Sequence, residues 1–113
     1  MSLQMSETDQ KAIRELYSAI KNEFKVTKIL LFGSRARGDA DAYSDIDLLV
    51  LTEKPRDIKD RYKLSDIAAD INIDYGVAIS CLYMNEQDWE QELDINPLLK
   101  KNIQEEGIEL VLQ

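Results

Sequence analysis

Two apolar segments separated by a polar stretch of about a dozen residues constrain this chain most. Val26 to Phe32 (VTKILLF) stops at Gly33, and Asp45 to Leu51 (DIDLLVL) is apolar on both faces. β-Branched and apolar runs of this kind predict strands, and the second pattern predicts a strand inside a sheet. Ser34 to Tyr43 is too polar and irregular for a core element, so we expect a loop or a short helix there. Connections of that length in a small domain are usually functional.

The remaining elements are signalled by capping residues and by the spacing of apolar side chains. The pattern predicts a helix that begins after a capping box at Ser6–Asp9 and runs to about Phe24. Further along it predicts a second long helix that ends before Gly76, a third strand, two later helical starts and a short edge strand. The helix is marked by Ile58, Tyr62, Ile67, Ala68 and Ile71, and the third strand is Val77 to Met84. The later helices start at Asn85 and at Asn96-Pro97, and Gly107 ends the last one. The edge strand is Ile108 to Leu112.

This order of elements predicts an α/β (α+β) fold in which helices pack on a small mixed β-sheet. A length of 113 residues suits one domain, which we place at residues 6–112. A second methionine at Met5 suggests that residues 1–5 are a disordered N-terminus or a remnant of an expression vector.

Charge and composition narrow the chemistry. Fourteen Lys and Arg against 22 Asp and Glu give a net charge of −8, which argues against binding duplex nucleic acid over a broad surface. Phosphate would have to be held locally. The chain has no histidine, which excludes Ser-His and Cys-His nucleophile pairs and any His-containing zinc site. Catalysis would therefore depend on carboxylates and a metal ion.

The cysteine count and the hydropathy pattern bear on location. Cys81 is the single cysteine and cannot form an internal disulfide, and in an apolar strand it is expected to be a small core residue. No stretch reaches the roughly 20 apolar residues that span a bilayer, and the N-terminus lacks the pattern of a signal peptide. We expect a cytoplasmic protein without a membrane partner.

Asp45 and Asp47 form the first candidate site. Side chains at positions i and i+2 of a strand share one face, so both carboxylates project the same way. Hard oxygen ligands suit Mg²⁺, which usually takes one or two protein carboxylates together with substrate phosphates. The alternative is a solvated strand start whose acids face water.

Gly33 and Ser34 form the second candidate site. Glycine lets the backbone approach a phosphate closely, and Ser34 offers a hydroxyl and a backbone N–H at the predicted loop or helix start. Arg35 and Arg37 would add positive charge. The alternative for these two arginines is surface pairing with Asp39 and Asp41.

The spacing of these residues resembles a known signature. Gly33-Ser34, ten residues, then Asp45-Ile46-Asp47 is similar to the GS-x10-DxD pattern of the DNA polymerase β-like nucleotidyltransferase superfamily. The span FGSRARGDADAYSDIDLLV resembles its minimal nucleotidyltransferase (MNT) branch, single-domain proteins often paired with HEPN-domain toxins. The resemblance extends over roughly Ser6 to Leu112.

The resemblance implies a nucleotidyltransferase fold and a set of roles. Gly33, Ser34 and Arg35 would bind the nucleotide, and Asp45 and Asp47 would be catalytic and would hold Mg²⁺, or Mn²⁺ in its place. The reaction would transfer a nucleoside monophosphate from a nucleoside triphosphate, ATP being the expected one, to a hydroxyl acceptor, for which a HEPN toxin is one candidate. The acceptor site of so small a domain is one reason to expect a homo-oligomer.

One position departs from the family's pattern. The family's third carboxylate normally sits on the next strand, where this chain has no acid and where Ser80 stands at the expected place. An enzyme is the first interpretation. The alternative is a catalytically weak or inactive, antitoxin-like binding module that sequesters a HEPN-domain partner. Asp74 is a substitute third acid in a further alternative, although a place at a helix end suits it better.

An aromatic group raises a last alternative. Trp89 with Tyr83 and Leu93 would form an exposed surface for a partner, whereas aromatic side chains at this spacing are more often core.

Overall fold

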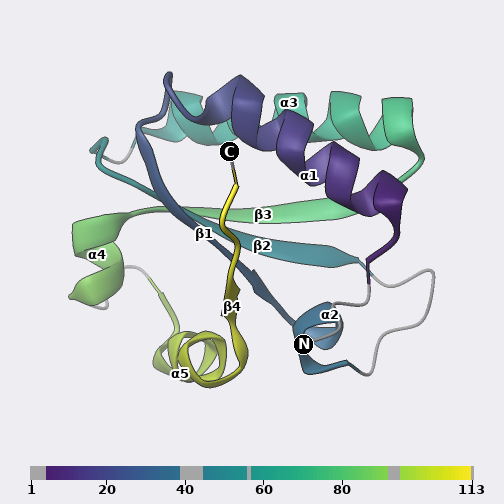
Figure 1. Cartoon of the computed structure of the whole chain (residues 1–113). Coiled ribbons are helices and arrows are strands. Elements are labelled where there is room, and N and C mark those ends of the chain that lie inside the picture. The colour runs from purple at the N-terminus through teal and green to yellow at the C-terminus, as the bar shows by residue number, and fades with distance from the viewer. Residues whose placement is uncertain (1–4, 39–44, 56, 92–94, 113) are drawn as a thin grey trace.

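The computed structural model describes residues 5–38, 45–55, 57–91 and 95–112, which form one four-stranded sheet with helices on both faces (Figure 1). In chain order the elements are α1 (Glu7–Ile20), β1 (Val26–Phe32), α2 (Ser34–Arg37), β2 (Ile46–Thr52), α3 (Ile58–Tyr75), β3 (Ile79–Asn85), α4 (Glu86–Glu90), α5 (Pro97–Glu106) and β4 (Ile108–Glu109).

The sheet is mixed, with strand order β3-β2-β1-β4. β1 runs antiparallel to β2 and to β4, whereas β2 and β3 are parallel. The parallel pair is connected by α3, as a parallel connection in one sheet requires a crossover element. The predicted small mixed α/β sheet with packed helices is therefore confirmed.

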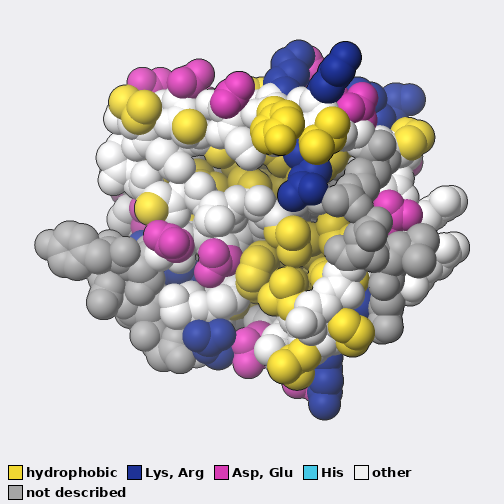
Figure 2. Space-filling model, turned by 180° about the vertical axis from the view of Figure 1, so that it is seen from behind, with side chains coloured by type: hydrophobic (Ala, Val, Ile, Leu, Met, Phe, Trp, Pro, Cys, Tyr) yellow, Lys and Arg dark blue, Asp and Glu magenta, His cyan; other side chains and the backbone are white. Residues whose placement is uncertain are grey.

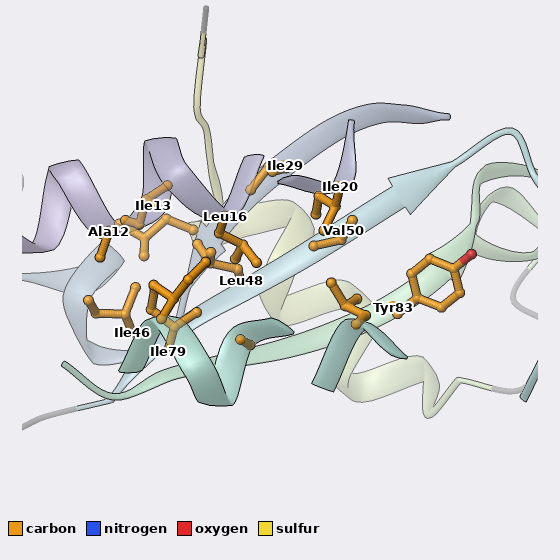
Figure 3. Close-up of a cluster of buried hydrophobic side chains, with 14 of the residues drawn as sticks. Ala12, Ile13, Leu16, Ile20, Ile29, Ile46, Leu48, Val50, Ile79 and Tyr83 are labelled. Atoms are coloured by element: carbon orange, nitrogen blue, oxygen red, sulfur yellow. The ribbon is translucent and has the colours of Figure 1, made fainter. Parts of the chain in front are cut away.

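The larger core lies between the sheet and the helices α1 and α3, which cover the same face (Figure 1). Figure 3 shows how isoleucines, leucines and an alanine from α1, β1, β2 and β3 point into this layer. Its most deeply buried side chains include Ala12, Leu16, Ile20, Phe24, Leu31, Leu48 and Val50. Burial of this apolar surface is the main term that holds the helices on the sheet.

A smaller core lies on the other face, beneath α4 and α5. Its buried members are Leu49, Leu51, Met84, Trp89 and Ile103. Figure 2, seen from behind Figure 1, shows hydrophobic side chains gathered between the α3 side above and the α5 side below. The alternation along β2 explains the two layers, because Leu48 and Val50 point to the first face while Leu49 and Leu51 point to the second.

Most predicted boundaries agree with the structure. The capping box is present, since the Ser6 hydroxyl accepts the Asp9 N–H and the Asp9 carboxylate accepts the Ser6 N–H. α1 ends at Ile20 rather than near Phe24, because a turn follows that still buries the phenylalanine. The edge strand is shorter than expected and comprises Ile108–Glu109.

Residues 1–4 and 39–44 lie outside the described residues. Of the predicted N-terminal tail, Met5 is described, and it packs against the larger core. Within the part of the chain that the structure describes, no helix is long and apolar enough to cross a membrane.

Candidate functional site

The end of β1 and the start of β2 lie at the same end of the sheet. Because the two strands are antiparallel, Phe32 lies opposite Asp47, and the chain enters Gly33 directly beside that carboxylate. The side chains of Phe32 and Asp47 share the face covered by α5, as cross-strand partners do. Two motifs separated by ten residues in the sequence are thus adjacent in space.

Gly33 adopts a backbone conformation that favours glycine, with φ 75° and ψ −157°. A Cβ atom placed on this residue would collide with Oδ2 of Asp47. The absence of a side chain therefore lets the turn lie against the carboxylate. Ser34 follows as the first residue of α2, and its carbonyl accepts the N–H of Gly38 at 3.0 Å.

Asp45 and Asp47 form a carboxylate pair at the start of β2. Asp45 is exposed and Asp47 is partly buried. Burial raises the pKa of Asp47, the nearby charge of Asp45 raises it further, and the positive charge of Arg37 lowers it. The two carboxylates and the guanidinium are therefore close enough to influence one another.

The donor set fits one hard divalent cation. Among the described residues no group of three or more His, Cys, Asp or Glu side chains is arranged to hold a metal ion. Two carboxylates are nevertheless the usual protein contribution to a Mg²⁺ site that is completed by phosphate oxygens and water. The mutual repulsion of Asp45 and Asp47, seen in the pKa of Asp47, is what a cation at this place would relieve.

Ser80 lies beside the acid pair. The parallel register of β2 and β3 pairs it with Asp47, so both side chains project from the same face of the sheet, and Ser80 is exposed. The position next to Asp47 on β3 therefore carries a hydroxyl, and its replacement of a third carboxylate stays a prediction.

Arg35 is buried in an ion pair with the first helix. Its Nη1 lies 3.1 Å from Oδ2 of Asp9, and the two side chains are 8% and 12% exposed. Asp9 is the capping-box residue of α1, so the pair connects the start of α1 to the turn after Gly33. The predicted contact of Arg35 with nucleotide stays a prediction, and the guanidinium is committed to Asp9 in this structure.

Arg37 is the arginine that faces the acid pair. It is 44% exposed and its Nη1 lies 3.3 Å from Oε2 of Glu106 in α5. Its charge also lowers the pKa of Asp47. The sequence indicates Arg37 as added positive charge but does not indicate that α5 brings Glu106 to it. The predicted partners Asp39 and Asp41 lie outside the described residues.

The two arginines should differ in their contribution to stability. We expect Arg35→Ala to lower the free energy of unfolding by about 3 kcal/mol, because it leaves the buried carboxylate of Asp9 without its cationic partner. Arg37→Ala is the matched control and should cost at most about 1 kcal/mol, since its pair is exposed. Urea unfolding followed by circular dichroism measures both. Equal small losses would contradict a structural role for Arg35.

Of the other residues singled out in the sequence, those that the structure describes lie in the core or on the opposite face of the sheet from Asp47. Burial raises the pKa of the Cys81 thiol to about 12, which leaves it protonated and unreactive at neutral pH. Asp74 is exposed in the last turn of α3, and α3 covers the opposite face of the sheet from Asp47. Trp89 and Tyr83 are each 8% exposed and belong to the two cores, while Leu93 lies outside the described residues.

A cavity of about 560 Å³ lies at the other end of β2 and β3 from the acid pair. Its walls carry four acidic side chains, Glu53, Glu86, Asp88 and Glu90. These charges would repel a triphosphate, and no described basic side chain lines the cavity to offset them. Its size therefore does not make it the candidate nucleotide site.

Comparison with known proteins identifies the family. The model of the nucleotidyltransferase domain family matches residues 13–110. The chain therefore belongs to the nucleotidyltransferase domain family.

A curated relative and two solved structures illustrate the likeness. MJ0604 of Methanocaldococcus jannaschii, provisionally named a protein adenylyltransferase, is 34% identical over 101 residues, which is 88% of this chain and 94% of the relative. A structure provisionally described as a minimal nucleotidyltransferase is 26% identical with a TM-score of 0.62, covering 95% of this chain and 98% of the other.

The second structure is a complex. One of its chains has a TM-score of 0.57 at 18% identity and covers 92% of this chain and 72% of its own length. The complex is that of a tri-AMPylated HEPN toxin of Shewanella oneidensis with an MNT antitoxin. At this level of identity the similarity shows the fold.

Proposed function

We propose that this domain binds a Mg²⁺-nucleoside triphosphate at the site formed by Gly33, Ser34, Asp45 and Asp47, and transfers a nucleoside monophosphate to a hydroxyl acceptor. The observation that carries the proposal is the contact between the Gly33 turn and the Asp47 carboxylate. A phosphate chain held at the turn would have its α-phosphate within reach of the acid pair.

Each residue has a defined part in this proposal. Gly33 leaves room for the phosphates, and the Ser34 hydroxyl donates a hydrogen bond to a phosphate oxygen. Asp45 and Asp47 accept the cation. When bound, Mg²⁺ neutralises charge on the phosphates and orients the α-phosphorus for attack. Arg37 adds a positive charge near the departing phosphates, while Arg35 holds the turn in place through Asp9.

The proposed reaction is balanced without a redox partner. The acceptor hydroxyl oxygen forms a bond to the α-phosphorus, the bond from that phosphorus to the bridging oxygen of the β-phosphate breaks, and pyrophosphate leaves. The hydroxyl proton must pass to a base. Ser80 is a poor base at its ordinary pKa, so water or a group of the acceptor would take the proton.

The names of similar proteins favour ATP and a protein acceptor. One relative is named for protein adenylyl transfer, and one complex of the same fold contains an AMPylated HEPN toxin. A HEPN-domain protein is therefore the first acceptor to test. The second candidate function is that of a binding module which sequesters such a partner without modifying it, and the uncharged Ser80 beside Asp47 favours it.

Incubation with α-labelled ATP, Mg²⁺ and a candidate acceptor separates the two functions. Label that appears on the acceptor supports transfer. Tight binding of a HEPN protein with no label, while Mg²⁺-ATP still binds in calorimetry, supports the binding module. Failure of Mg²⁺-ATP and Mg²⁺-tripolyphosphate to bind at all would contradict the proposed site.

Ser80→Asp should raise the rate of transfer. The new carboxylate would stand level with Asp47 on the same face and would supply the anionic ligand and base that the serine lacks. Loss of a general base costs about 10²- to 10⁴-fold in rate, and we expect a gain of about tenfold, because a single added ligand lacks the surrounding groups that orient it.

A control adds a carboxylate at an exposed position away from the acid pair. Ile73→Asp does so on α3, where Ile73 is 80% exposed and the helix covers the opposite face of the sheet from Asp47, and it should not raise the rate. Equal rates for the unchanged protein and Ser80→Asp would mean that another group already completes the site.

A further inference from the structure

A cavity of about 180 Å³ lies between α2 and α5, directly beside Gly33. Phe32 and Arg37 form one wall, and Leu99, Asn102, Ile103 and Glu106 of α5 form the other. Gly33 thus borders both the cavity and the Asp47 carboxylate. A ligand anchored at the acid pair would have this cavity as its immediate neighbour.

The size and lining of the cavity suit a flat ring better than a phosphate. Pockets that enclose a whole drug-sized ligand measure about 300–1,000 Å³, so this one suits one part of a nucleotide. Phe32, Leu99 and Ile103 supply apolar walls, and the pairing of Arg37 with Glu106 leaves the lining without a net positive charge for a phosphate. Apolar walls with few polar groups are typical of sites that bind bases.

Asn102 is the polar group available to such a ring. Within the described residues its side chain takes part in no hydrogen bond, whereas Arg37 and Glu106 are paired at 3.3 Å. A carboxamide offers a donor and an acceptor side by side. The edge of adenine that carries the amino group and N7 matches that pair, whereas the corresponding edge of guanine presents two acceptors.

The α5 wall is firmly attached to the sheet. Ile103 is 1% exposed in the smaller core, and the Lys100 ammonium donates to the carbonyl of Glu90 at 3.2 Å and lies 5.5 Å from the centre of the Trp89 ring. Asn102 is therefore presented from a fixed helix rather than from a loop.

We propose that this cavity receives the base of an adenine nucleotide and that Asn102 determines the preference for adenine. The inference rests on the proposed nucleotide site, and it adds where the base lies and which residue selects adenine.

Calorimetry of the full chain with Mg²⁺ tests it, with ATP, GTP, CTP and inorganic tripolyphosphate as separate probes. The unchanged protein should bind ATP more tightly than the other probes. Asn102→Ala should weaken the binding of ATP by about tenfold, the scale of one lost bidentate contact to a base, and leave the affinity for tripolyphosphate unchanged. Gln104→Ala, on the other side of α5, is the control and should change neither.

A second pair of variants fills the cavity instead of altering its polar group. Leu99→Trp should exclude the base and reduce ATP affinity to that of tripolyphosphate. Leu98→Trp is the control, because Leu98 is 65% exposed and does not line the cavity. Thermal unfolding of all four variants verifies that they are folded.

The outcomes separate the two levels of the proposal. Tripolyphosphate binding without preference among the nucleotides, or an ATP affinity unaffected by both Asn102→Ala and Leu99→Trp, would overturn the base site and leave the phosphate site standing. No binding of tripolyphosphate to the unchanged protein would overturn the proposed function, and the base site with it.

Discussion

The double variant Asp45→Asn with Asp47→Asn is expected to lose Mg²⁺-dependent nucleotide binding and to reduce any transfer activity by at least about 1,000-fold. The neutral amides cannot supply the two anionic ligands, and a catalytic metal contributes several kcal/mol to stabilising the transition state. Calorimetry with and without Mg²⁺ measures the binding, and transfer of labelled nucleotide measures the rate.

The same variant should remain folded. Its free energy of unfolding at neutral pH should be unchanged or higher, because burial and the charge of Asp45 both disfavour the ionised form of Asp47 in the folded protein. The raised pKa means that the native state binds more protons than the unfolded state just above pH 3.8, so this carboxyl lowers stability as pH rises through that window.

A charge-matched control is available on α3. Asp66→Asn with Asp70→Asn removes two exposed acids at helical spacing on α3, which covers the opposite face of the sheet, and should leave nucleotide binding unchanged. If the Asp45 and Asp47 variant binds Mg²⁺-ATP as tightly as this control does, the site is wrongly assigned. If it unfolds instead, the two acids have a structural role.

Gly33→Val is expected to abolish nucleotide binding and to destabilise the fold by about 3 kcal/mol or more. A side chain here is strained at φ 75°, which by itself costs about 1–3 kcal/mol, and its Cβ would occupy the position of the Asp47 carboxylate. The branched atoms would also fill the space that the phosphates need. Urea unfolding and calorimetry report the two effects separately.

Two comparisons distinguish strain from collision. Gly38→Ala meets no atom within 4 Å at φ 83°, so it should cost only the left-handed penalty of about 1–2 kcal/mol. Gly33→Ala should cost more in the unchanged protein than in an Asp47→Ala background, where the colliding carboxylate is absent. Equal costs in the two backgrounds would show that the Gly33 turn does not lie against Asp47.

Local sequence signals predicted the elements well where the physics is local. β1 was predicted at Val26–Phe32, and the capping box of α1 and the asparagine caps of α4 and α5 are present as expected. These features depend on residues within one turn or one strand of each other. The length of the edge strand could not be predicted, because it depends on the pairing of β4 with Leu30 and Leu31 of β1, which lie far away in the sequence.

The site could be predicted in part. The spacing of Gly33-Ser34 and Asp45-Ile46-Asp47 pointed to the residues that the structure brings together. The position of Arg35 beside Ser34 predicts a contact with nucleotide, and nothing local indicates that Asp9, 26 residues away, pairs with its guanidinium. Nothing in the sequence marked Asn102 either, because its relevance depends on where α5 crosses the sheet.

The sequence by itself determined which segments form strands and helices and which acids share a strand face. Those properties follow from side-chain periodicity and backbone preference, which act over a few residues. Only the tertiary structure decided that Ser80 is level with Asp47, that Arg37 rather than Arg35 faces the acids, and that α5 closes a cavity beside Gly33. These depend on strand register and helix docking, which burial of apolar surface fixes between residues far apart in the chain.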